Sequence, residues 1–533
     1  MRTASNIAFG ILPLLVSGFQ GYNKSFEYGR GFERRCASLA NSLHIPDGEV
    51  VLTEFVPAGS VLEFPNSEPT CNRTSQAVTT DLCRVAMTVA TSNQSGLYME
   101  SWLPKAWTGR FLSTGNGGLG GCIQYEDVEY AASLGFAAVG TNNGHDGMSG
   151  KFYLNNPDVI EDYAYRALHT GVVVGKEVTK SFYKRGYTKS YYLGCSSGGR
   201  QGLKEAQDFP DDFDGIVAGD PAISFNNLTS WSCHFLPLTG VEGSPTFVPL
   251  DMWSIIHQDI LDQCDELDGV RDGVIESPDL CNYVPDGLLC SQGQTSDCLS
   301  ATQVETVRGV YAPLLGEDGS FSYPRMAPGT EGTEAPAAYY AGLPFDESDW
   351  FRYVVFNDSN WDPLSLVPAN YTTASVQNPF NVETWNGDLS GLQEKGVKLL
   401  HYHGSVDGII SSEISPLYYE HVSQTMGLSP TELDDFYRFF RIAGMGHCSG
   451  GPGASFIGNT KANLASLNPD ENVLMAMVRW VEEDIAPETI TGTSYVNGTK
   501  AAGVGFKRAH CRWPYRNVYQ SGDPTVESSW SCV

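Results

Sequence analysis

Ser196 has the setting of a catalytic nucleophile. It lies in Gly194-Cys195-Ser196-Ser197-Gly198, a G-x-S-x-G motif that follows an apolar run and opens a stretch of helical character. The glycines leave room for the sharp strand-to-helix turn that exposes a serine oxygen. Ser197 offers a competing hydroxyl, but the spacing of the motif assigns the nucleophile to Ser196.

A serine hydroxyl needs a base that an acid orients, and on an α/β-hydrolase sheet the chain order is Ser, Asp or Glu, then His. His447 lies in the glycine-rich GMGHCSGG loop after the last strong strand, where catalytic bases are found. His510 is late enough in the chain, but its basic neighbours disfavour an imidazolium. His401 and His403 come too early and have the pattern of strand residues. We therefore expect His447 to be the base.

The acid is expected at the end of the strand near 397–403. Asp407 follows that strand in HGSVDGII. Asp434 and Asp435 are the alternatives, but they precede the next strand and so fall at the opposite end of a parallel sheet. We expect Asp407 to orient His447.

An oxyanion hole needs two backbone N–H donors. One is expected from Ser197, the residue after the nucleophile. The other is expected from the early TGNGG loop, whose glycines let the backbone approach a substrate oxygen. The residues alone do not decide whether Gly117 or Gly118 is this donor, and we take Gly118. The alternative is that the TGNGG loop is an ordinary flexible turn with no role in catalysis.

Two cysteines flank the predicted triad. Cys195 directly precedes Ser196, and Cys448 directly follows His447. If the triad forms, these sulfurs come close, and a disulfide between them would tie nucleophile and base together. Two unrelated buried thiols are the alternative.

An acidic loop, CDELDGVRDGVIE, follows at 264–276. Asp265, Asp268 and Asp272 are hard oxygen ligands suited to Ca²⁺. The spacing is not that of an EF-hand, because Leu267 and Gly269 occupy two ligand positions. A solvated acidic loop is the alternative.

These residues must be positioned by a sheet. From about 84 to 222, and again from about 396, continuous apolar runs end in glycine-rich turns, which is typical of parallel strands buried on both faces. Between 224 and 394 the chain is rich in Asp, Pro, Gly and Trp. We therefore predict an α/β-hydrolase fold, with a catalytic domain over 19–223 and 395–533 and an inserted lid domain over 224–394. The lid would roof the active site; a stabilising side domain is the alternative.

Composition narrows the possible partners. The 533 residues carry a net charge of −29, which repels phosphate backbones and disfavours nucleic acid and anionic membranes. No apolar run is long enough to span a bilayer. Residues 1–18 have the pattern of a signal peptide, with a buried N-terminal helix as the alternative.

Cysteines and sequons also indicate a secreted, extracellular protein. Thirteen cysteines favour an oxidising compartment and leave one thiol over, whereas the CxxC pairs of a cytosolic metal protein are absent. Seven N-x-S/T sequons are candidate glycosylation sites: Asn23, Asn72, Asn93, Asn227, Asn357, Asn370 and Asn497.

Taken together, the motifs resemble the fungal tannase and feruloyl esterase family. The resemblance covers nearly all of the mature chain and rests on GCSSGGRQG, HGSVDGII, GMGHCSGG, TGNGG and CDELDGVRDG. The family's Cys–Ser, Asp, His–Cys arrangement matches Cys195-Ser196, Asp407 and His447-Cys448. The similarity is greatest to type B feruloyl esterases, including the FPDDFDGIVAGDPA stretch.

The resemblance also implies a metal site and a set of disulfides. The acidic loop would bind structural Ca²⁺ through the side chains of Asp265, Asp268 and Asp272 and the carbonyls of Val270 and Val274. The disulfides that the resemblance implies are Cys36–Cys83, Cys71–Cys122, Cys264–Cys281, Cys290–Cys298 and Cys511–Cys532. Cys233 is then the free thiol.

The sequence therefore predicts a secreted serine esterase that releases hydroxycinnamic acids such as ferulate from plant cell-wall polysaccharides through an acyl-enzyme. A tannase acting on galloyl esters is the nearest alternative. A non-catalytic glycoprotein or a peptidase on the same scaffold is less consistent with a complete triad and no sign of a peptide channel.

Overall fold

The computed structural model describes residues 31–533. The predicted signal peptide over 1–18 and the sequon at Asn23 lie outside the described residues. Within the described part, no helix combines the length and the apolar character needed to cross a bilayer.

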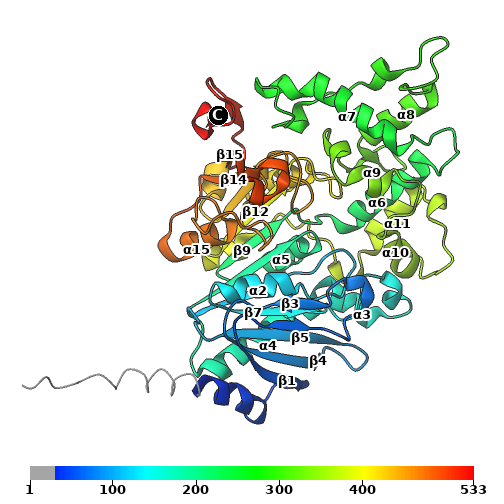
Figure 1. Ribbon diagram of the computed structural model, residues 1–533. Helices are drawn as coiled ribbons and strands as arrows, with labels where there is room; N and C mark the ends of the chain where they lie inside the picture. The colour runs from blue at the N-terminus through cyan, green and yellow to red at the C-terminus, as the bar shows by residue number, and fades with distance from the viewer. Residues whose placement is uncertain (1–30) are drawn as a thin grey trace, which may run out of the picture.

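A nine-stranded sheet forms the centre of the described chain (Figure 1). Its last six strands run parallel to one another, while the first three are antiparallel to their neighbours. In spatial order the strands are β1 (Gly48–Val56), β4 (Leu82–Ala90), β5 (Gly96–Pro104), β7 (Phe136–Thr141), β6 (Arg110–Thr114), β8 (Lys189–Cys195), β9 (Gly215–Gly219), β12 (Lys398–Gly404) and β13 (Tyr437–Ile442).

Apolar runs form the parallel strands because both faces of the sheet are covered. Every residue of β7 and of β9 is buried. Successive side chains enter opposite cores: Phe111 and Ile216 pack on one face, and their neighbours Leu112 and Val217 pack on the other. This burial on two sides confirms the predicted fold class, a largely parallel α/β sheet.

Helices cover both faces. Leu168 of α4 (Ala167–Tyr183) and Leu203 of α5 (Ser197–Asp208) belong to the core on one face. Val128 of α2 (Tyr125–Ser133) and Leu474 of α15 (Val473–Glu483) belong to the core on the other. The result is a three-layer arrangement that presents the carboxyl ends of β8, β9, β12 and β13 along one edge.

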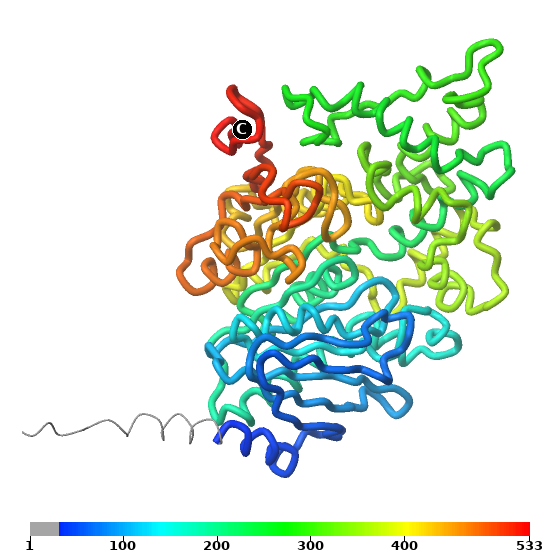
Figure 2. The backbone as a smooth tube through the Cα atoms, viewed as in Figure 1, coloured from blue at the N-terminus to red at the C-terminus, as the bar shows by residue number. Residues whose placement is uncertain are grey.

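The insertion after β9 is mainly helical and lies beside the sheet (Figures 1 and 2). Its elements are α6 (Phe225–Thr239), α7 (Leu250–Cys264), α8 (Ala301–Val310), β10 (Leu314–Leu315), β11 (Phe321–Tyr323), α9 (Ala335–Tyr339), α10 (Ser348–Trp350), α11 (Pro368–Gln377) and α12 (Ser390–Lys395). The chain then returns to the sheet as β12, followed by α13 (Ile414–Met426).

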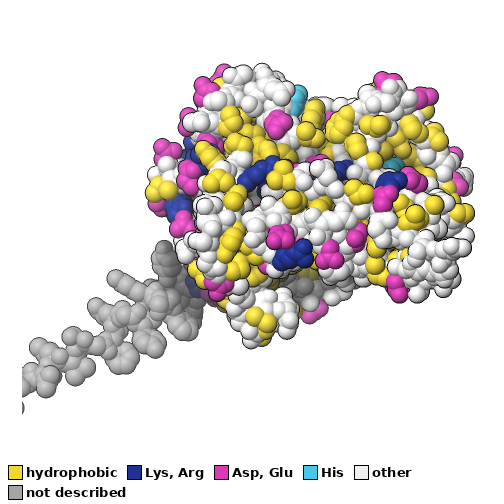
Figure 3. All heavy atoms as spheres, turned by 90° about the horizontal axis from the view of Figure 1, so that it is seen from above, with side chains coloured by type: hydrophobic (Ala, Val, Ile, Leu, Met, Phe, Trp, Pro, Cys, Tyr) yellow, Lys and Arg dark blue, Asp and Glu magenta, His cyan; other side chains and the backbone are white. Residues whose placement is uncertain are grey.

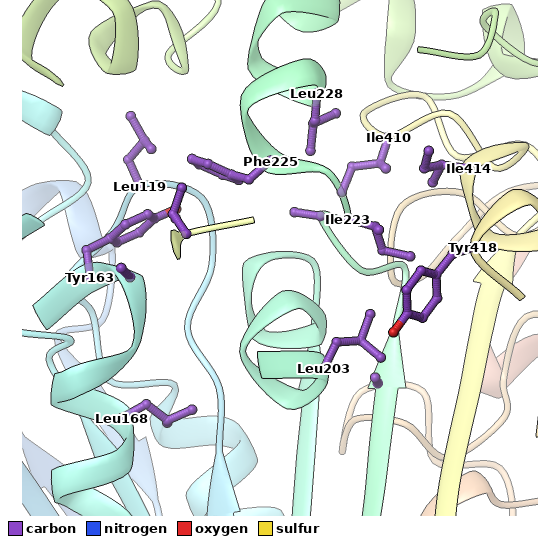
Figure 4. Close-up of a cluster of buried hydrophobic side chains, with 14 of the residues drawn as sticks. Leu119, Tyr163, Leu168, Leu203, Ile223, Phe225, Leu228, Ile410, Ile414 and Tyr418 are labelled. Atoms are coloured by element: carbon purple, nitrogen blue, oxygen red, sulfur yellow. The ribbon is translucent and has the colours of Figure 1, made fainter. Parts of the chain in front are cut away.

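The insertion shares a hydrophobic cluster with the sheet layer. Phe225 and Leu228 of α6 lie on the side of the insertion and Leu203 of α5 on the side of the sheet, with Tyr163 to one side and Ile410 to the other (Figure 4). All five side chains belong to one buried cluster. The insertion is therefore anchored by apolar contact directly behind the ends of the central strands.

Six disulfides join described residues in the pattern that the resemblance and the triad spacing predict. Cys233 of α6 is the free, buried thiol. The bonded pairs are Cys36–Cys83, Cys71–Cys122, Cys195–Cys448, Cys264–Cys281, Cys290–Cys298 and Cys511–Cys532.

Acidic side chains are dispersed over the face drawn in Figure 3. Neutral and apolar side chains separate them, and basic side chains do not form a continuous patch on that face. The charge of −29 is thus spread on this face and not gathered at one spot.

Candidate active site

Ser196 occupies a strained turn between β8 and α5. Its φ of 65° lies in a region that residues other than glycine seldom adopt. The surrounding glycines are required: a Cβ on Gly194 would meet the Gly198 carbonyl at 2.6 Å, and one on Gly199 would meet the Gly219 carbonyl at 2.2 Å. Ser196 is half-buried, and its Oγ makes no hydrogen bond to a described residue. The turn therefore leaves the hydroxyl free for a substrate.

Asp407 and His447 form a direct pair. Asp407 follows β12, His447 follows β13, and His447 Nδ1 lies 2.8 Å from Asp407 Oδ2. The other oxygen, Asp407 Oδ1, accepts the backbone N–H groups of Ile409 at 2.8 Å and Ile410 at 2.9 Å. The acid is fully buried, whereas 17% of the His447 side chain is exposed. The carboxylate thus holds Nδ1, and Nε2 has no hydrogen-bond partner among the described residues.

The pair favours an imidazolium. Burial lowers the pKa of His447, but the charge and hydrogen bond of Asp407 outweigh it and raise the pKa to about 9. Asp220 and Glu334 add smaller contributions in the same direction. Burial opposes ionisation of Asp407, yet His447 and His403 hold the pKa of this carboxyl well below its usual range. The buried Asp407 anion thus stabilises the imidazolium that forms when His447 accepts a proton, which is the role of the acid in an acyl-transfer triad.

A disulfide brings the serine turn and the histidine loop together. Cys195 and Cys448 are bonded, with their Cα atoms 6.0 Å apart, across a sequence separation of 253. Because these cysteines adjoin Ser196 and His447, the bond places the two loops side by side. The backbone of Cys448 has a φ of 60°, so the histidine loop turns sharply at this point.

The predicted oxyanion donors lie on adjoining backbone segments. Ser197 Oγ donates to the Gly118 carbonyl at 2.8 Å, which joins the start of α5 to the TGNGG loop. Gln201 of α5 also accepts the Asn116 backbone N–H at 2.9 Å. Neither the Ser197 N–H nor the Gly118 N–H donates to a described residue. Both N–H groups thus lack a partner among the described residues, and their oxyanion role stays a prediction.

The rejected alternatives lie elsewhere. His510 is buried on β15 (Val504–Cys511), where burial, with a smaller effect of Arg508, lowers its pKa to about 4. Asp434 precedes β13 and pairs with Arg512 at the far end of the strand. His401 and His403 are residues of β12, as predicted from the pattern.

Two residues near the pair were missed from the sequence. Asp220 follows β9, and its carboxylate accepts N–H groups from Gly404 and Cys448. His403 Nε2 lies 3.2 Å from Asp407 Oδ2. The one local signal was that Asp220 directly follows a buried strand; the contact of His403 with Asp407 had no signal in the sequence.

The insertion is tied to the loop that carries the acid. Thr333 Oγ1 donates to the Val406 carbonyl at 3.0 Å, and Tyr339 OH donates to the Ile409 carbonyl at 2.6 Å. A Cβ on Gly408 would meet the Ala335 backbone nitrogen at 2.6 Å. The segment around α9 thus covers the loop beside Asp407.

The acidic loop has free oxygens of the kind that a calcium ion needs. Asp265, Asp268 and Asp272 each accept one loop N–H, from Gly273, Val270 and Val274. The second oxygens of Asp265 and Asp268 are buried without a partner among described residues. The carbonyls of Val270 and Val274 likewise accept no hydrogen bond from a described residue.

The third aspartate of the loop is partly committed elsewhere. The second oxygen of Asp272 accepts from Arg508 at 2.9 Å. The three aspartates of the loop do not bring their carboxylate oxygens within 4.8 Å of one another. Among the described residues, three other groups of possible ligands do: Cys195–Asp220–Cys448, His169–Glu205–Asp212 and Asp220–His403–Asp407. The donor set fits a hard cation at Asp265, Asp268 and the two carbonyls, and the calcium site stays a prediction.

The sequons differ in exposure. Asn72, Asn93, Asn357 and Asn497 are exposed. Asn227 is half-buried, and its side-chain oxygen accepts from Ser375 at 2.6 Å. Glycosylation stays a prediction, and Asn227 is the position least suited to it.

Known proteins resemble this chain over nearly its full length. Residues 82–533 match the family described as tannase and feruloyl esterase. The probable feruloyl esterase B-2 of Aspergillus terreus is 52% identical over 98% of this chain and 99% of its own length. The probable feruloyl esterase B of Emericella nidulans is 54% identical over the same shares.

Solved structures agree. The crystal structure of feruloyl esterase B from Aspergillus oryzae matches with a TM-score of 0.92 and 51% identity, covering 94% of this chain and all of that one. Tannin acyl hydrolase from Aspergillus niger matches with a TM-score of 0.73 at 22% identity over 94% of each chain, a likeness of fold alone. This chain belongs to the tannase and feruloyl esterase family.

Proposed function

We propose that this chain is a secreted serine esterase that hydrolyses feruloyl and related hydroxycinnamoyl esters of plant cell-wall polysaccharides. One observation carries the proposal: the Asp407–His447 pair at 2.8 Å is bonded through Cys448 to the Ser196 turn. Identity of 51% with feruloyl esterase B from Aspergillus oryzae supports the hydroxycinnamoyl acyl group.

Ser196 and His447 carry out acylation. As Ser196 Oγ attacks the ester carbonyl, His447 Nε2 takes its proton, and Asp407 stabilises the imidazolium. The Ser197 and Gly118 N–H groups hold the oxyanion. The tetrahedral intermediate collapses, His447 returns the proton to the leaving alcohol, and the acyl group stays on Ser196.

Deacylation repeats the same steps with water. His447 takes a proton from the water that attacks the acyl-enzyme, and the second intermediate releases the free acid as Ser196 Oγ regains the proton. No redox or organic cofactor takes part in this sequence of steps.

The remaining features are assigned supporting roles. The insertion over 224–394 acts as a lid above the catalytic domain, because its segment around α9 contacts the loop of Asp407. Asp265, Asp268 and the carbonyls of Val270 and Val274 would hold a structural Ca²⁺ that stabilises this insertion, and Asp272 would join them by giving up its contact with Arg508. Six disulfides and the pattern of 1–18 suit an exported protein.

A panel of methyl esters tests the proposal. Methyl ferulate, caffeate, p-coumarate and gallate are compared under identical conditions, with Ser196→Ala as the matched inactive control. We expect turnover of the hydroxycinnamates and little of the gallate, together with release of ferulate from feruloylated arabinoxylan. A preference for methyl gallate would replace the proposal with a tannase, and turnover by Ser196→Ala would refute the mechanism.

A further inference from the structure

A chain of buried polar side chains runs from Tyr437 to the acid of the triad. Tyr437 OH lies 2.9 Å from His401 Nδ1, and His401 Nε2 lies 2.8 Å from Ser415 Oγ. Ser415 Oγ lies 2.6 Å from His403 Nδ1, and His403 Nε2 lies 3.2 Å from Asp407 Oδ2. All five side chains are fully buried. The chain links β12, β13 and α13 beneath the active site.

The ionised acid fixes the direction of every bond in this chain. An ionised Asp407 can only accept, so His403 Nε2 must carry the hydrogen. A neutral His403 then accepts at Nδ1, which requires the Ser415 hydroxyl to donate. Ser415 in turn accepts from His401 Nε2, which leaves His401 Nδ1 to accept from Tyr437 OH.

The opposite protonation of His403 leaves a hydroxyl without a partner. A doubly protonated His403 would donate to Ser415 Oγ. If His401 then carries its hydrogen on Nε2, the Ser415 hydroxyl hydrogen lacks an acceptor among the described residues, because Ser415 Oγ contacts only the two histidines. If His401 carries it on Nδ1, Ser415 can donate to His401, but the Tyr437 hydroxyl hydrogen then lacks an acceptor among the described residues. A buried donor left unsatisfied is destabilising. Burial also lowers the pKa of His401 well below its usual value, which keeps this ring neutral.

We propose that His403 is a positioning residue for Asp407 and that Ser415, His401 and Tyr437 fix its tautomer. The proposal rests on the esterase function proposed above. Asp407 then receives four hydrogen bonds: two backbone N–H groups on Oδ1, and His403 and His447 on Oδ2. Because His403 and His447 share one oxygen, His403 limits how far the carboxylate can rotate and how strongly it attracts the His447 proton.

The charges around His403 support a role in tuning the triad. Asp407 lies at 3.2 Å and Asp220 Oδ1 at 3.8 Å, while His401 approaches through Ser415 and His447 lies across Asp407. Removing the His403 donor leaves more of the Asp407 charge to stabilise the His447 imidazolium. The pKa of His447 should therefore rise when His403 is replaced by an apolar residue.

Two substitutions at one position separate positioning from mere packing. His403→Leu removes the donor, whereas His403→Gln can present an N–H near the place of Nε2. With methyl ferulate as substrate, we expect His403→Leu to lower kcat about 10- to 100-fold with little change in KM. We also expect it to move the acid limb of the pH profile of kcat/KM to higher pH. His403→Gln should recover most of kcat and return the limb toward that of the wild type.

A second pair on α13 covers the case in which His403→Leu fails to fold. Ser415→Ala cuts the relay without touching Asp407, and we expect a smaller fall in kcat with a shift of the same sign. Ser423→Ala is the matched control, since its Oγ donates to the Leu428 carbonyl at 2.6 Å on the same helix but away from the triad. It should leave kcat and the pH profile unchanged.

Nitrogen NMR of the wild-type histidines gives a readout that does not depend on turnover. We expect His401 and His403 to show one protonated and one unprotonated ring nitrogen each at neutral pH. A doubly protonated His403 would overturn the assigned direction. The positioning role would be overturned if folded His403→Leu kept the wild-type kcat and an unmoved acid limb. If His403→Leu does not fold, the same result in Ser415→Ala would overturn it. If the wild type hydrolyses no ester, the proposed function fails instead.

Discussion

Asp220 accepts the backbone N–H of Cys448 at 3.0 Å, next to the loop residue His447. Its other oxygen accepts the N–H of Gly404 at 2.6 Å, at the end of the strand that leads to Asp407. Oδ2 also lies 3.1 Å from the sulfur of Cys195, which precedes Ser196. One buried carboxylate thus contacts all three backbone segments that carry the proposed triad.

Asp220→Asn tests this arrangement and the pH dependence together. Asp220 helps to raise the pKa of His447 to about 9, so its loss should move the acid limb of kcat/KM to lower pH. The amide can accept only one of the two N–H groups through oxygen, so we expect kcat to fall about tenfold as the histidine loop loosens. Asp220→Asn should move the acid limb to lower pH, whereas His403→Leu should move it to higher pH. Each variant is therefore the control of the other. An acid limb that stays in place would show that Asp220 does not act on His447.

Ser196→Ala and Ser197→Ala separate the two hydroxyls of the turn. Removing the nucleophile should lower kcat by at least about 10⁴-fold, as loss of a triad member does in other hydrolases. Ser197→Ala keeps its backbone N–H but loses the bond from Oγ to the Gly118 carbonyl, so a reduction of only a few-fold is expected. Active-site titration with a fluorophosphonate distinguishes the two, since only Ser196→Ala should fail to react.

The sequence was most informative where one local motif determines the geometry. The G-x-S-x-G turn, the strand ending before Asp407 and the loop of His447 could all be located because apolar runs and glycines mark the strand ends. The structure brings Asp407 and His447 together as predicted, and the fold class and family are confirmed. The catalytic roles themselves stay predictions.

The residues that were missed depend on contacts between distant segments. Asp220 looked like one more acidic residue in FPDDFDGIVAGDPA, since nothing local shows that the ends of β9 and β12 bring its carboxylate to Gly404. His403 was placed correctly in a strand, but the strand pattern does not reveal that it faces Asp407 through Nε2. Both roles follow from the order of strands in the sheet, which periodicity does not give.

Calcium removal should destabilise the insertion more than it changes catalysis. The free oxygens of Asp265 and Asp268 are buried, and without a cation they lack a partner among the described residues. We expect metal analysis of the purified protein to find about one calcium per chain. Chelation should lower Tm by several degrees while KM for methyl ferulate changes less than twofold.

Asp268→Asn and Glu266→Gln provide the matched pair for that prediction. Asp268→Asn should reproduce the effect of chelation, whereas Glu266 lies in the same loop with an exposed ion pair to Arg271 and should be neutral. Absence of calcium from the native protein, or equal stability of the two variants, would remove the metal site.

Loss of the Cys195–Cys448 disulfide should reduce activity far more than its effect on stability explains. The bond closes a loop of 253 residues, for which the chain-entropy relation gives roughly 5 kcal/mol, less where other disulfides already shorten the loop. For activity the local effect matters more, because displacement of reacting groups by about 1 Å can cost on the order of 100-fold in rate even while the protein stays folded. Cys195→Ala with Cys448→Ala should therefore lower kcat about 100-fold at temperatures where the variant is still folded.

Cys290→Ala with Cys298→Ala, which opens a short loop in the insertion, is the control and should retain wild-type kcat. Peptide mapping without reduction should recover the 195–448 cross-link, and free alkylation of both thiols in the folded protein would disprove the bond.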